Sequence, residues 1–283
     1  TTMINATKRK RVIAYLLLLV FSCYLAGAAG LSAHFIDVGQ GDAILVCTPN
    51  GSTLLIDAGP RVAGSTVVEY LKKLGIHEID VVVATHPHED HIGGFPAVFE
   101  SFSVDRVYFT DHEHTTKTYE RFLDAVNASG AYRVRAVAGK TIDIDPEVQI
   151  EILSPLDKRY RDLNHSSVVL RLTYGKTAFL FTGDMEVLNE NELLAEKVAV
   201  GADVLKVAHH GSSTSSSMVF LEQVSPTVAV IMCGSGNSYG HPHREVLDRL
   251  ESLHVEVLRT DLLGTVVIES NGMELTFRSK SGS

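Results

Sequence analysis

Cysteine is scarce in this sequence. The 283 residues include three cysteines, and Cys23 lies within an apolar segment near the start of the chain. Cys47 and Cys233 remain, both beside stretches that are typical of strands. One pair excludes the disulfide framework of a small secreted domain, although a single bond between the two is compatible with an exported protein. We expect both to be small residues of a hydrophobic core.

An excess of positive charge is also lacking. The formal net charge is −9, from 25 basic and 34 acidic residues. Without the four basic residues at Lys8 to Arg11, 21 basic and 34 acidic residues remain, which is a net charge of −13. A domain this acidic is not a general nucleic-acid clamp. Bound divalent cations would offset the charge locally, so a small cleft for phosphate groups remains allowed.

Only one long apolar run is present. It extends from Val12 to about Leu31 and follows the basic cluster at Lys8 to Arg11, the pattern of a secretory signal or an N-terminal membrane anchor. A buried core helix is the third interpretation, but it leaves the basic cluster unexplained. We predict a signal peptide or membrane anchor over residues 1–32 and a single domain over residues 33–283. This domain is expected to be exported, either extracellular or anchored to the outer face of the cytoplasmic membrane.

The remaining sequence shows the same order of elements twice. Two β-rich runs joined by Asn50-Gly51 precede a helix predicted at 67–74 and a strand at 79–84. Two strands within 166–184 then precede a helix at 187–200 and a strand at 204–208. Histidines follow the last strand of each set. This order predicts an α/β fold of two similar halves, with two sheets packed face to face, helices outside and a site at the sheet edges.

The stretch "THPHEDH" carries the strongest chemical signal. It follows an apolar strand and holds His86, His88, Asp90 and His91. A loop can turn alternate side chains in different directions, so we expect His86 and His88 to hold one metal ion and Asp90 and His91 to face a second. Such ligands suit zinc or manganese, and a water between two such ions loses a proton near neutral pH. One histidine after a strand is ordinarily a loop residue, but this spacing favours metal binding.

The second half offers further ligands. Asp184 ends the apolar stretch "FLFTGD", where an aspartate commonly caps the next helix. Beside a histidine cluster we favour a carboxylate that bridges the metals. His209 and His210 follow the next strand, and we expect at least one to be a ligand. The other would line the cleft or protonate a leaving group.

Seven motifs in order now identify a family resemblance: "HFIDVGQGDA", "LLIDAG", "THPHEDHIGG", "NHSSVVLRL", "FTGD", "KVAHHGSSTS" and "YGHPHREVL". Together they resemble the metallo-β-lactamase superfamily and, within it, the hydrolase domain of ComEC/Rec2-type competence proteins. The resemblance implies a four-layer αββα sandwich and a hydrolytic site with two divalent metal ions.

Individual residues take their expected roles from this resemblance. The signature ligands match His86, His88, Asp90 and His91, the bridging aspartate matches Asp184, and the late histidine falls on His209 or His210. Asp57 matches an aspartate that braces the metal loop from behind. Where many members have a third histidine for the first metal, this chain has Asn164-His165, so either His165 completes that site or the site lacks a ligand and binds one metal weakly.

Other polar segments remain open. His241 either faces the cleft or is an ordinary histidine before a helix that Pro242 starts. His114 is expected in a loop entering a helix at 119–126, bordering the substrate rather than forming a third metal cluster. The "GQGD" stretch predicts a strained turn that holds Asp42 behind the site, not a phosphate loop. The serines of "HHGSSTSSS" are expected to be flexible, donating to a substrate oxygen or covering the cleft.

The expected activity is metal-dependent hydrolysis by a metal-bound hydroxide, with zinc favoured and manganese as the alternative. Asp90 would hold or accept the proton, and His210 is the predicted acid. Phosphodiester cleavage is favoured, because carboxylate-rich sites are common among phosphodiester-cleaving members. The substrate would be single-stranded DNA or a phosphate-bearing wall polymer. The membrane would be a partner only if the N-terminal segment is retained. No obligate protein partner is expected. Hydrolysis of a carboxylic ester, thioester or lactam, and a non-catalytic metal-stabilised binding module, are the alternatives.

Overall fold

Two β-sheets form the centre of the protein in a computed structural model that describes residues 30–112 and 114–279. The first sheet has the strand order β14-β13-β1-β2-β3-β4-β5-β6, and the second has the order β12-β11-β10-β9-β8-β7. Strand bounds in the first sheet are β1 Leu31–Phe35, β2 Ile44–Cys47, β3 Thr53–Ile56, β4 Glu78–Val83, β5 Ser103–Phe109, β6 Tyr132–Arg135, β13 Val266–Ser270 and β14 Leu275–Ser279. Those in the second are β7 Val148–Ser154, β8 Val169–Tyr174, β9 Thr177–Phe181, β10 Val204–Lys206, β11 Val228–Ile231 and β12 Glu256–Arg259.

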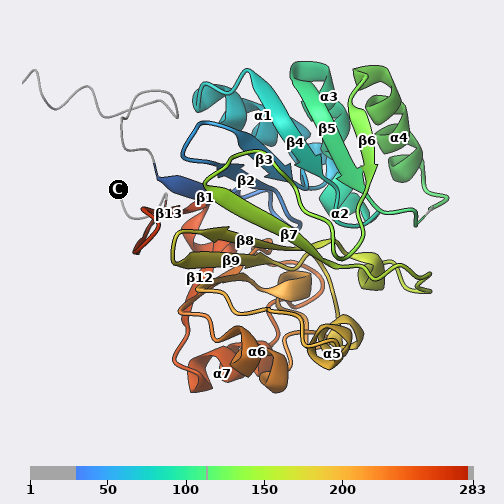
Figure 1. Ribbon diagram of the computed structural model, residues 1–283. Helices are drawn as coiled ribbons and strands as arrows, with labels where there is room; N and C mark the ends of the chain where they lie inside the picture. Colours follow the sequence, from blue (N-terminus) through green and yellow to red (C-terminus); the bar gives the residue numbers. More distant parts are fainter. Residues whose placement is uncertain (1–29, 113, 280–283) are drawn as a thin grey trace, which may run out of the picture.

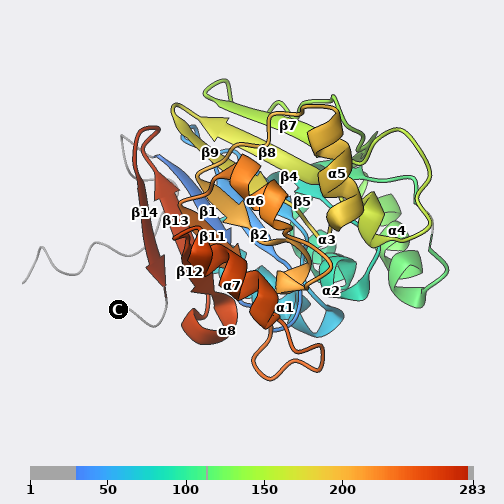
Figure 2. The same cartoon turned by 90° about the horizontal axis from the view of Figure 1, so that it is seen from below.

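Helices cover the outer face of each sheet. Figure 1 shows α1, α3 and α4 above the first sheet and α5, α6 and α7 below the second, and Figure 2 shows this lower layer from below. Their bounds are α1 Gly64–Lys73, α3 Phe95–Ser101, α4 Lys117–Ser129, α5 Val187–Ala195, α6 Met218–Val224 and α7 Arg244–Ser252. The shorter elements are α2 Glu89–Ile92, α8 Thr260–Leu263, η2 Arg61–Ala63, η3 Asn164–Ser166 and η4 Ala208–Gly211. The predicted four-layer αββα sandwich is confirmed.

The burial pattern explains why the sequence folds in layers. Strands β2, β3, β9 and β11 are buried at every position, because each sheet is covered on both faces. One hydrophobic cluster fills the space between the sheets, where Phe35 lies 6.2 Å from Phe181 by ring centroid. One further hydrophobic cluster lies beneath the outer helices of the first half, and another lies beneath those of the second half. This packing leaves the loops at the strand ends to carry polar side chains.

Several predicted boundaries need correction. The first β-rich run divides into β1 and β2, and the Asn50-Gly51 turn joins β2 to β3. Helix α5 ends at Ala195, earlier than the predicted residue 200. The predicted division between residues 32 and 33 falls within β1, since Leu31 pairs with Ser270 and Ser32 with Glu269.

The end of the second half contributes strands to the first sheet. The C-terminal hairpin β13–β14 belongs to the first sheet, where β13 pairs antiparallel with β1. Cys47 and Cys233 are both buried, and the disulfide left open by the sequence is not formed between them. No helix in the described part of the chain is both long and apolar enough to cross a bilayer. The predicted signal or anchor lies outside the described residues, apart from residues 30–32.

Candidate metal centre

The chemically active residues follow strands of both sheets. The loop after β4 leads into α2 and carries the "THPHEDH" histidines, while Asp184 follows β9 and His209 and His210 lie in η4 after β10. The two sheets therefore contribute side chains to a single centre, although His91 and His210 are far apart in the sequence.

Asp184 lies in the middle of this centre. Its Oδ2 atom is 3.2 Å from His91 Nε2 and 3.4 Å from His210 Nε2. His86 Nε2 and His209 Nε2 each lie 3.9 Å from the same oxygen. A carboxylate approached by four imidazoles agrees with the bridging position expected from the family resemblance rather than with a helix cap.

Among the residues that the structure describes, three ligand-type atoms of the centre are buried and have no hydrogen-bond partner: His91 Nε2, His210 Nε2 and Asp184 Oδ1. Ligand atoms of Asp90, His91, Asp184 and His210 all lie within 4.8 Å of one another. Unpartnered buried polar atoms are rare in folded proteins because each forfeits its hydration. Imidazole nitrogens and carboxylate oxygens are ligands for zinc and similar divalent ions, so these residues fit a metal ion.

The opposite sides of the histidines are held by other groups. His91 Nδ1 lies 2.7 Å from Asp57 Oδ2, and Asp57 accepts hydrogen bonds from the Thr85 backbone amide at 2.8 Å and its hydroxyl at 2.7 Å. His210 Nδ1 lies 2.8 Å from the Met232 carbonyl oxygen. These contacts direct both Nε2 atoms toward Asp184, as carboxylate and carbonyl partners of metal ligands do. Asp57 thus lies behind the metal loop, where it was expected.

The backbone of these residues is strained. Asp57, His209 and His210 have φ angles of 57°, 49° and 55°, in the left-handed region that non-glycine residues rarely adopt. Such conformations cost free energy and persist where surrounding contacts require them. In η4 these backbone conformations allow the side chains of two consecutive histidines to approach the same centre from different directions.

Electrostatic interactions at the centre match its composition. Burial alone would lower the pKa values of His91 and His210, but the carboxylate of Asp184 and its acidic neighbours raise both well above the usual value. Burial disfavours ionisation of Asp184, yet His210 and His91 hold its pKa well below the usual value. The imidazolium charges therefore balance the carboxylates, and a bound divalent cation would take over this role and release protons.

His86 and His88 adjoin this group. His86 Nε2 lies 3.0 Å from His88 Nδ1, and burial, reinforced by His91, lowers the pKa of His86 well below its usual value. A neutral imidazole is the form that binds metal. His114 lies next to His88, at a ring-centroid distance of 6.5 Å, which places the loop before α4 at the rim of the centre.

His165 lies apart from this group. Its Nε2 atom is 3.1 Å from Glu186 Oε2. Asn164 is buried, with its amide nitrogen 3.5 Å from Glu186 Oε1 and its own Oδ1 unpartnered. His209 Nδ1 lies 3.3 Å from Glu186 Oε1. Glu186 therefore contacts both η3, which holds Asn164 and His165, and His209. The sequence pattern did not reveal this connection.

His241 borders the centre on its open side. Its ring lies 5.6 Å from that of His209 and 6.2 Å from that of His210, and the Tyr239 ring stacks on it at 5.6 Å. Burial and the neighbouring histidines lower the pKa of His241 to about 4, so its ring is neutral at physiological pH. Of the two interpretations, the position facing the cleft agrees with the structure.

Lys206 is a buried residue of the centre that the sequence pattern did not single out. It is fully buried, forms an ion pair with Asp42, donates to the Gly183 carbonyl oxygen at 3.1 Å and lies 3.8 Å from Asp184 Oδ1. Burial opposes its charge, but Asp42 and Asp184 raise the pKa of the ammonium group. The available signal was a lysine inside the otherwise apolar strand "VLKVA".

Two polar loops complete the surroundings. Asp42 lies behind the centre as predicted, with Oδ1 3.4 Å from His210 Nδ1. The serines of "HHGSSTSSS" were expected to be flexible, but the structure shows them packed. Ser215 and Ser216 are buried, and Glu190 accepts hydrogen bonds from the backbone amides of Ser216 and Ser217. The loop's polar composition is explained by these internal hydrogen bonds.

A cavity of about 690 Å³ opens onto the centre. Its lining joins segments from both halves: Val38, Gly39, Gln40, Pro60, Val62, His88, Glu89, Asp90, Asp184, His209, His210, Tyr239 and His241. Asp90 has an exposed side-chain fraction of 28%, against 2% for His210, so Asp90 is the more accessible of the two predicted catalytic residues. The cavity is large enough for a small organic substrate or part of a polymer.

Known proteins share this sequence and fold. ComE operon protein 3 of Bacillus subtilis is 31% identical over 267 residues, covering 88% of this chain and 34% of its own length. Competence protein ComA of Neisseria gonorrhoeae is 37% identical over 232 residues, covering 81% of this chain and 31% of its own length. The chain therefore spans about a third of the length of these relatives.

Solved structures show the same architecture at low sequence identity. CmlA, a diiron beta-hydroxylase from Streptomyces venezuelae, matches with a TM-score of 0.58 and 13% identity, over 86% of this chain and 54% of CmlA. The metallo-beta-lactamase fold protein YhfI from Bacillus subtilis matches with a TM-score of 0.53 and 14% identity, over 81% of this chain and 96% of YhfI. The family description matches residues 36–235 of the chain, which include the whole metal centre. The protein thus belongs to the metallo-beta-lactamase superfamily, as a hydrolase-fold member with a potential metal site that resembles the ComEC-type competence proteins.

Proposed function

We propose that the protein is a metal-dependent phosphodiesterase that acts on single-stranded DNA. The observation that carries this proposal is the group formed by Asp90, His91, Asp184 and His210, with unpartnered buried ligand atoms beside an open cavity. Two carboxylates in this group give the acidic site that resembles phosphodiester-cleaving members of the superfamily. The similarity to competence proteins supports the choice of DNA over a wall polymer.

The residues divide into binding and reacting groups. Asp90, His91, Asp184 and His210 would hold one divalent ion and His86 with His88 a second, with zinc favoured over manganese. Such ions polarise a phosphoryl oxygen and lower the pKa of bound water. Asp90, partly exposed at the cavity, is placed to hold or accept the proton of the attacking water.

The leaving group needs a proton donor, and the geometry favours His209 over the predicted His210. His210 is buried and its Nδ1 is committed to the Met232 carbonyl oxygen. His209 has a side chain that is 22% exposed, lines the cavity, and has Nδ1 near Glu186 Oε1 at 3.3 Å. Glu186 thereby orients the ring so that Nε2 faces the cavity, as a carboxylate orients a catalytic histidine.

Hydrolysis of bis(p-nitrophenyl) phosphate by the zinc- or manganese-loaded protein tests the function. We expect turnover in the wild type and its loss in His88→Ala, whereas His77→Ala, an exposed histidine outside the centre, retains it. Hydrolysis of nitrocefin or a thioester without phosphodiester turnover would replace the phosphodiesterase with an alternative hydrolase. Absence of all ester hydrolysis in metal-replete protein would favour the binding module.

A second substrate tests the role of His209. Nitrophenolate is a stable anion that departs without a proton, whereas a nucleoside alkoxide requires one. We therefore expect His209→Asn to lower kcat on a dinucleotide by roughly 100-fold or more, with a much smaller effect on bis(p-nitrophenyl) phosphate. Equal losses on both substrates would contradict a proton-donating role.

We also propose that the domain acts outside the cytoplasm, either released or anchored to the membrane. The support is the basic cluster at Lys8 to Arg11 followed by the apolar run. The mass of the protein recovered from the exporting cell tests this proposal. A mass lacking the first residues indicates cleavage, an intact mass in the membrane fraction indicates an anchor, and an intact mass in the cytoplasm contradicts export.

A further inference from the structure

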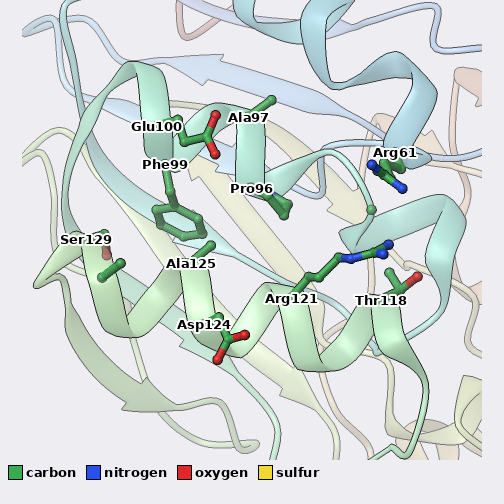
Figure 3. A pocket seen from close by; sticks show the side chains of 12 residues that line it. Arg61, Pro96, Ala97, Phe99, Glu100, Thr118, Arg121, Asp124, Ala125 and Ser129 are labelled. Atoms are coloured by element: carbon green, nitrogen blue, oxygen red, sulfur yellow. The ribbon is translucent and has the colours of Figure 1, made fainter.

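A groove of about 710 Å³ lies between α3 and α4, on the outer face of the first sheet. Arg61 lies at one end, and Phe99 lies toward the other end with Ala125 facing it (Figure 3). None of the predicted metal ligands lines this groove. We call it the α3–α4 groove.

The α3–α4 groove adjoins the metal cavity across η2 and α2. Pro60 and Val62 line the metal cavity, whereas Arg61 between them lines the groove. The Arg61 backbone amide donates to Glu89 Oε1 at 2.9 Å, which ties η2 to α2. Gly93 follows α2 directly and lines the groove. A chain-like ligand bound in the metal cavity therefore has a direct path across η2 into the groove.

The end of the groove nearest the metal cavity is basic. The Arg121 side chain points from α4 toward Arg61, and both arginines are exposed (Figure 3). Within residues 30–112 and 114–279, neither guanidinium has a carboxylate oxygen within 4.0 Å. The acidic residues Glu100 and Asp124 lie toward the other end. Two guanidinium groups of this kind can bind phosphate oxygens through paired hydrogen bonds, even though the protein as a whole is acidic.

The floor of the groove is apolar and aromatic. Phe99 is partly exposed, with its ring 5.8 Å from that of Phe95, and Pro96 and Ala97 continue the surface. Figure 3 shows the Phe99 ring over Ala125, farther along the groove from Arg61 than Pro96 is. A partly exposed aromatic ring in a groove that begins with cationic groups suits single-stranded nucleic acid, because a base can stack on the ring while preceding phosphates meet the cations. A polyol-phosphate polymer has no base to stack and would leave this surface uncovered.

We propose that the α3–α4 groove binds the nucleotides adjoining the scissile bond of a single-stranded nucleic acid, with Arg61 and Arg121 on phosphates and Phe99 under a base. This inference rests on the proposed phosphodiesterase function and adds a substrate-binding subsite to it. The subsite makes the protein prefer a polymer to a small diester. It also reconciles strand binding with the net negative charge, because only a few phosphates are contacted.

Equilibrium binding of a short fluorescein-labelled phosphorothioate oligothymidylate to the full, metal-loaded chain tests the proposal by fluorescence anisotropy. Between roughly 50 and 200 mM KCl, log K should fall with log salt, and each lost phosphate contact should reduce the slope by about 0.7. We expect Arg61→Gln combined with Arg121→Gln to make the slope shallower by about 1.4. The combination of Arg61→Lys with Arg121→Lys should retain most of the slope.

A matched control removes two positive charges elsewhere. Lys176 lies in the turn at the opposite end of β9 from Asp184, and Arg278 lies on the edge strand β14. Lys176→Gln with Arg278→Gln should leave the slope at its wild-type value. An unchanged slope in the Arg61/Arg121 variant, an equal change in this control, or no binding by the wild type at the lowest salt would overturn the proposal.

The role of Phe99 has its own test. Phe99→Leu should weaken oligothymidylate binding roughly tenfold and leave binding of an abasic strand of equal length unchanged. Equal wild-type affinity for the two strands would refute base stacking and point to a polyol-phosphate ligand. Hydrolysis of bis(p-nitrophenyl) phosphate by the same wild-type preparation is scored separately, so failure of the chemistry is distinguished from failure of the subsite.

Discussion

At the scale of single residues, Lys206 shows how the centre tolerates so much negative charge. Its ammonium group is fully buried between Asp42 and Asp184, with no exposed surface on its side chain. Removal of one partner from a buried ion pair leaves an uncompensated charge. Lys206 thus acts as a fixed internal cation beside the proposed metal ions.

We therefore expect Lys206→Met to lower the free energy of unfolding by about 3–5 kcal/mol, measured by urea denaturation in EDTA. Lys176→Met, at an exposed position, should change it by less than about 0.5 kcal/mol. The double variant Lys206→Met with Asp42→Asn should recover part of the loss, because it removes one of the stranded carboxylates. Equal stability of wild type and Lys206→Met would show that the ammonium charge does not stabilise the centre.

Residue patterns were informative where ligands are contiguous. His86, His88, Asp90 and His91 were predictable as a set, because four metal-capable side chains within six positions seldom occur together except at a metal site. The contacts of Lys206 and Glu186 were not predictable. A lysine in the apolar strand "VLKVA" indicates a buried charge but does not identify its partner, and Glu186 lies in an ordinary polar segment.

At the scale of elements, the junction of α2 and α3 depends on close packing. Gly93 and Gly94 have φ angles of −62° and −80°, which any residue adopts, so backbone freedom is not what requires glycine here. The requirement is space: a Cβ atom on Gly94 would lie 2.0 Å from the Ala58 carbonyl oxygen. The close approach of the Gly94 backbone to Ala58 holds α2, with Asp90 and His91, against the segment that follows Asp57.

Gly94→Ala is accordingly expected to lower the free energy of unfolding by about 1–3 kcal/mol, because the backbone must move to relieve the overlap. A Cβ atom at Gly201 would meet nothing within 4 Å, and its φ is not positive, so Gly201→Ala should be neutral or slightly stabilising. Thermal denaturation of both variants measures the difference. Equal melting temperatures for the two would contradict the packing argument.

Element prediction succeeded for local patterns and failed for distant pairing. The strand at 79–84 and the helix at 119–126 correspond to β4 and α4, because the first is a short apolar run and the second has apolar residues at helical spacing. The return of β13 to pair with β1 was missed, since strands so far apart in sequence leave no local trace of their partner.

At the scale of the whole molecule, the metal centre joins the two halves. Its ligand-type residues come from α2 beside the first sheet and from the loops after β9 and β10 in the second. Metal binding should therefore stabilise the complete sandwich, because a ligand that binds only the folded state adds its binding free energy to folding.

At a zinc concentration 100 times Kd, the gain is about 2.7 kcal/mol, which corresponds to a rise in Tm of roughly 5–10 °C. Differential scanning fluorimetry measures this shift, and EDTA should reverse it. Asp184→Asn should lose most of this shift in Tm, because a neutral amide replaces the carboxylate that the imidazoles of His86, His91, His209 and His210 approach. A wild-type shift in Asp184→Asn would place the ions elsewhere.

The linear order of residues was sufficient for the layered fold, the superfamily and the choice of the "THPHEDH" loop as the candidate metal-binding segment, because apolar patterning and contiguous motifs are local properties. It did not decide which of His209 and His210 approaches the metal centre more closely, since two adjacent histidines have the same chemistry. Folding distinguishes them: a left-handed backbone at both positions turns His210 onto the Met232 carbonyl oxygen and toward Asp184, and leaves His209 at the cavity beside Glu186. That choice depends on packing between the second-half strands and loops, which exists only in three dimensions.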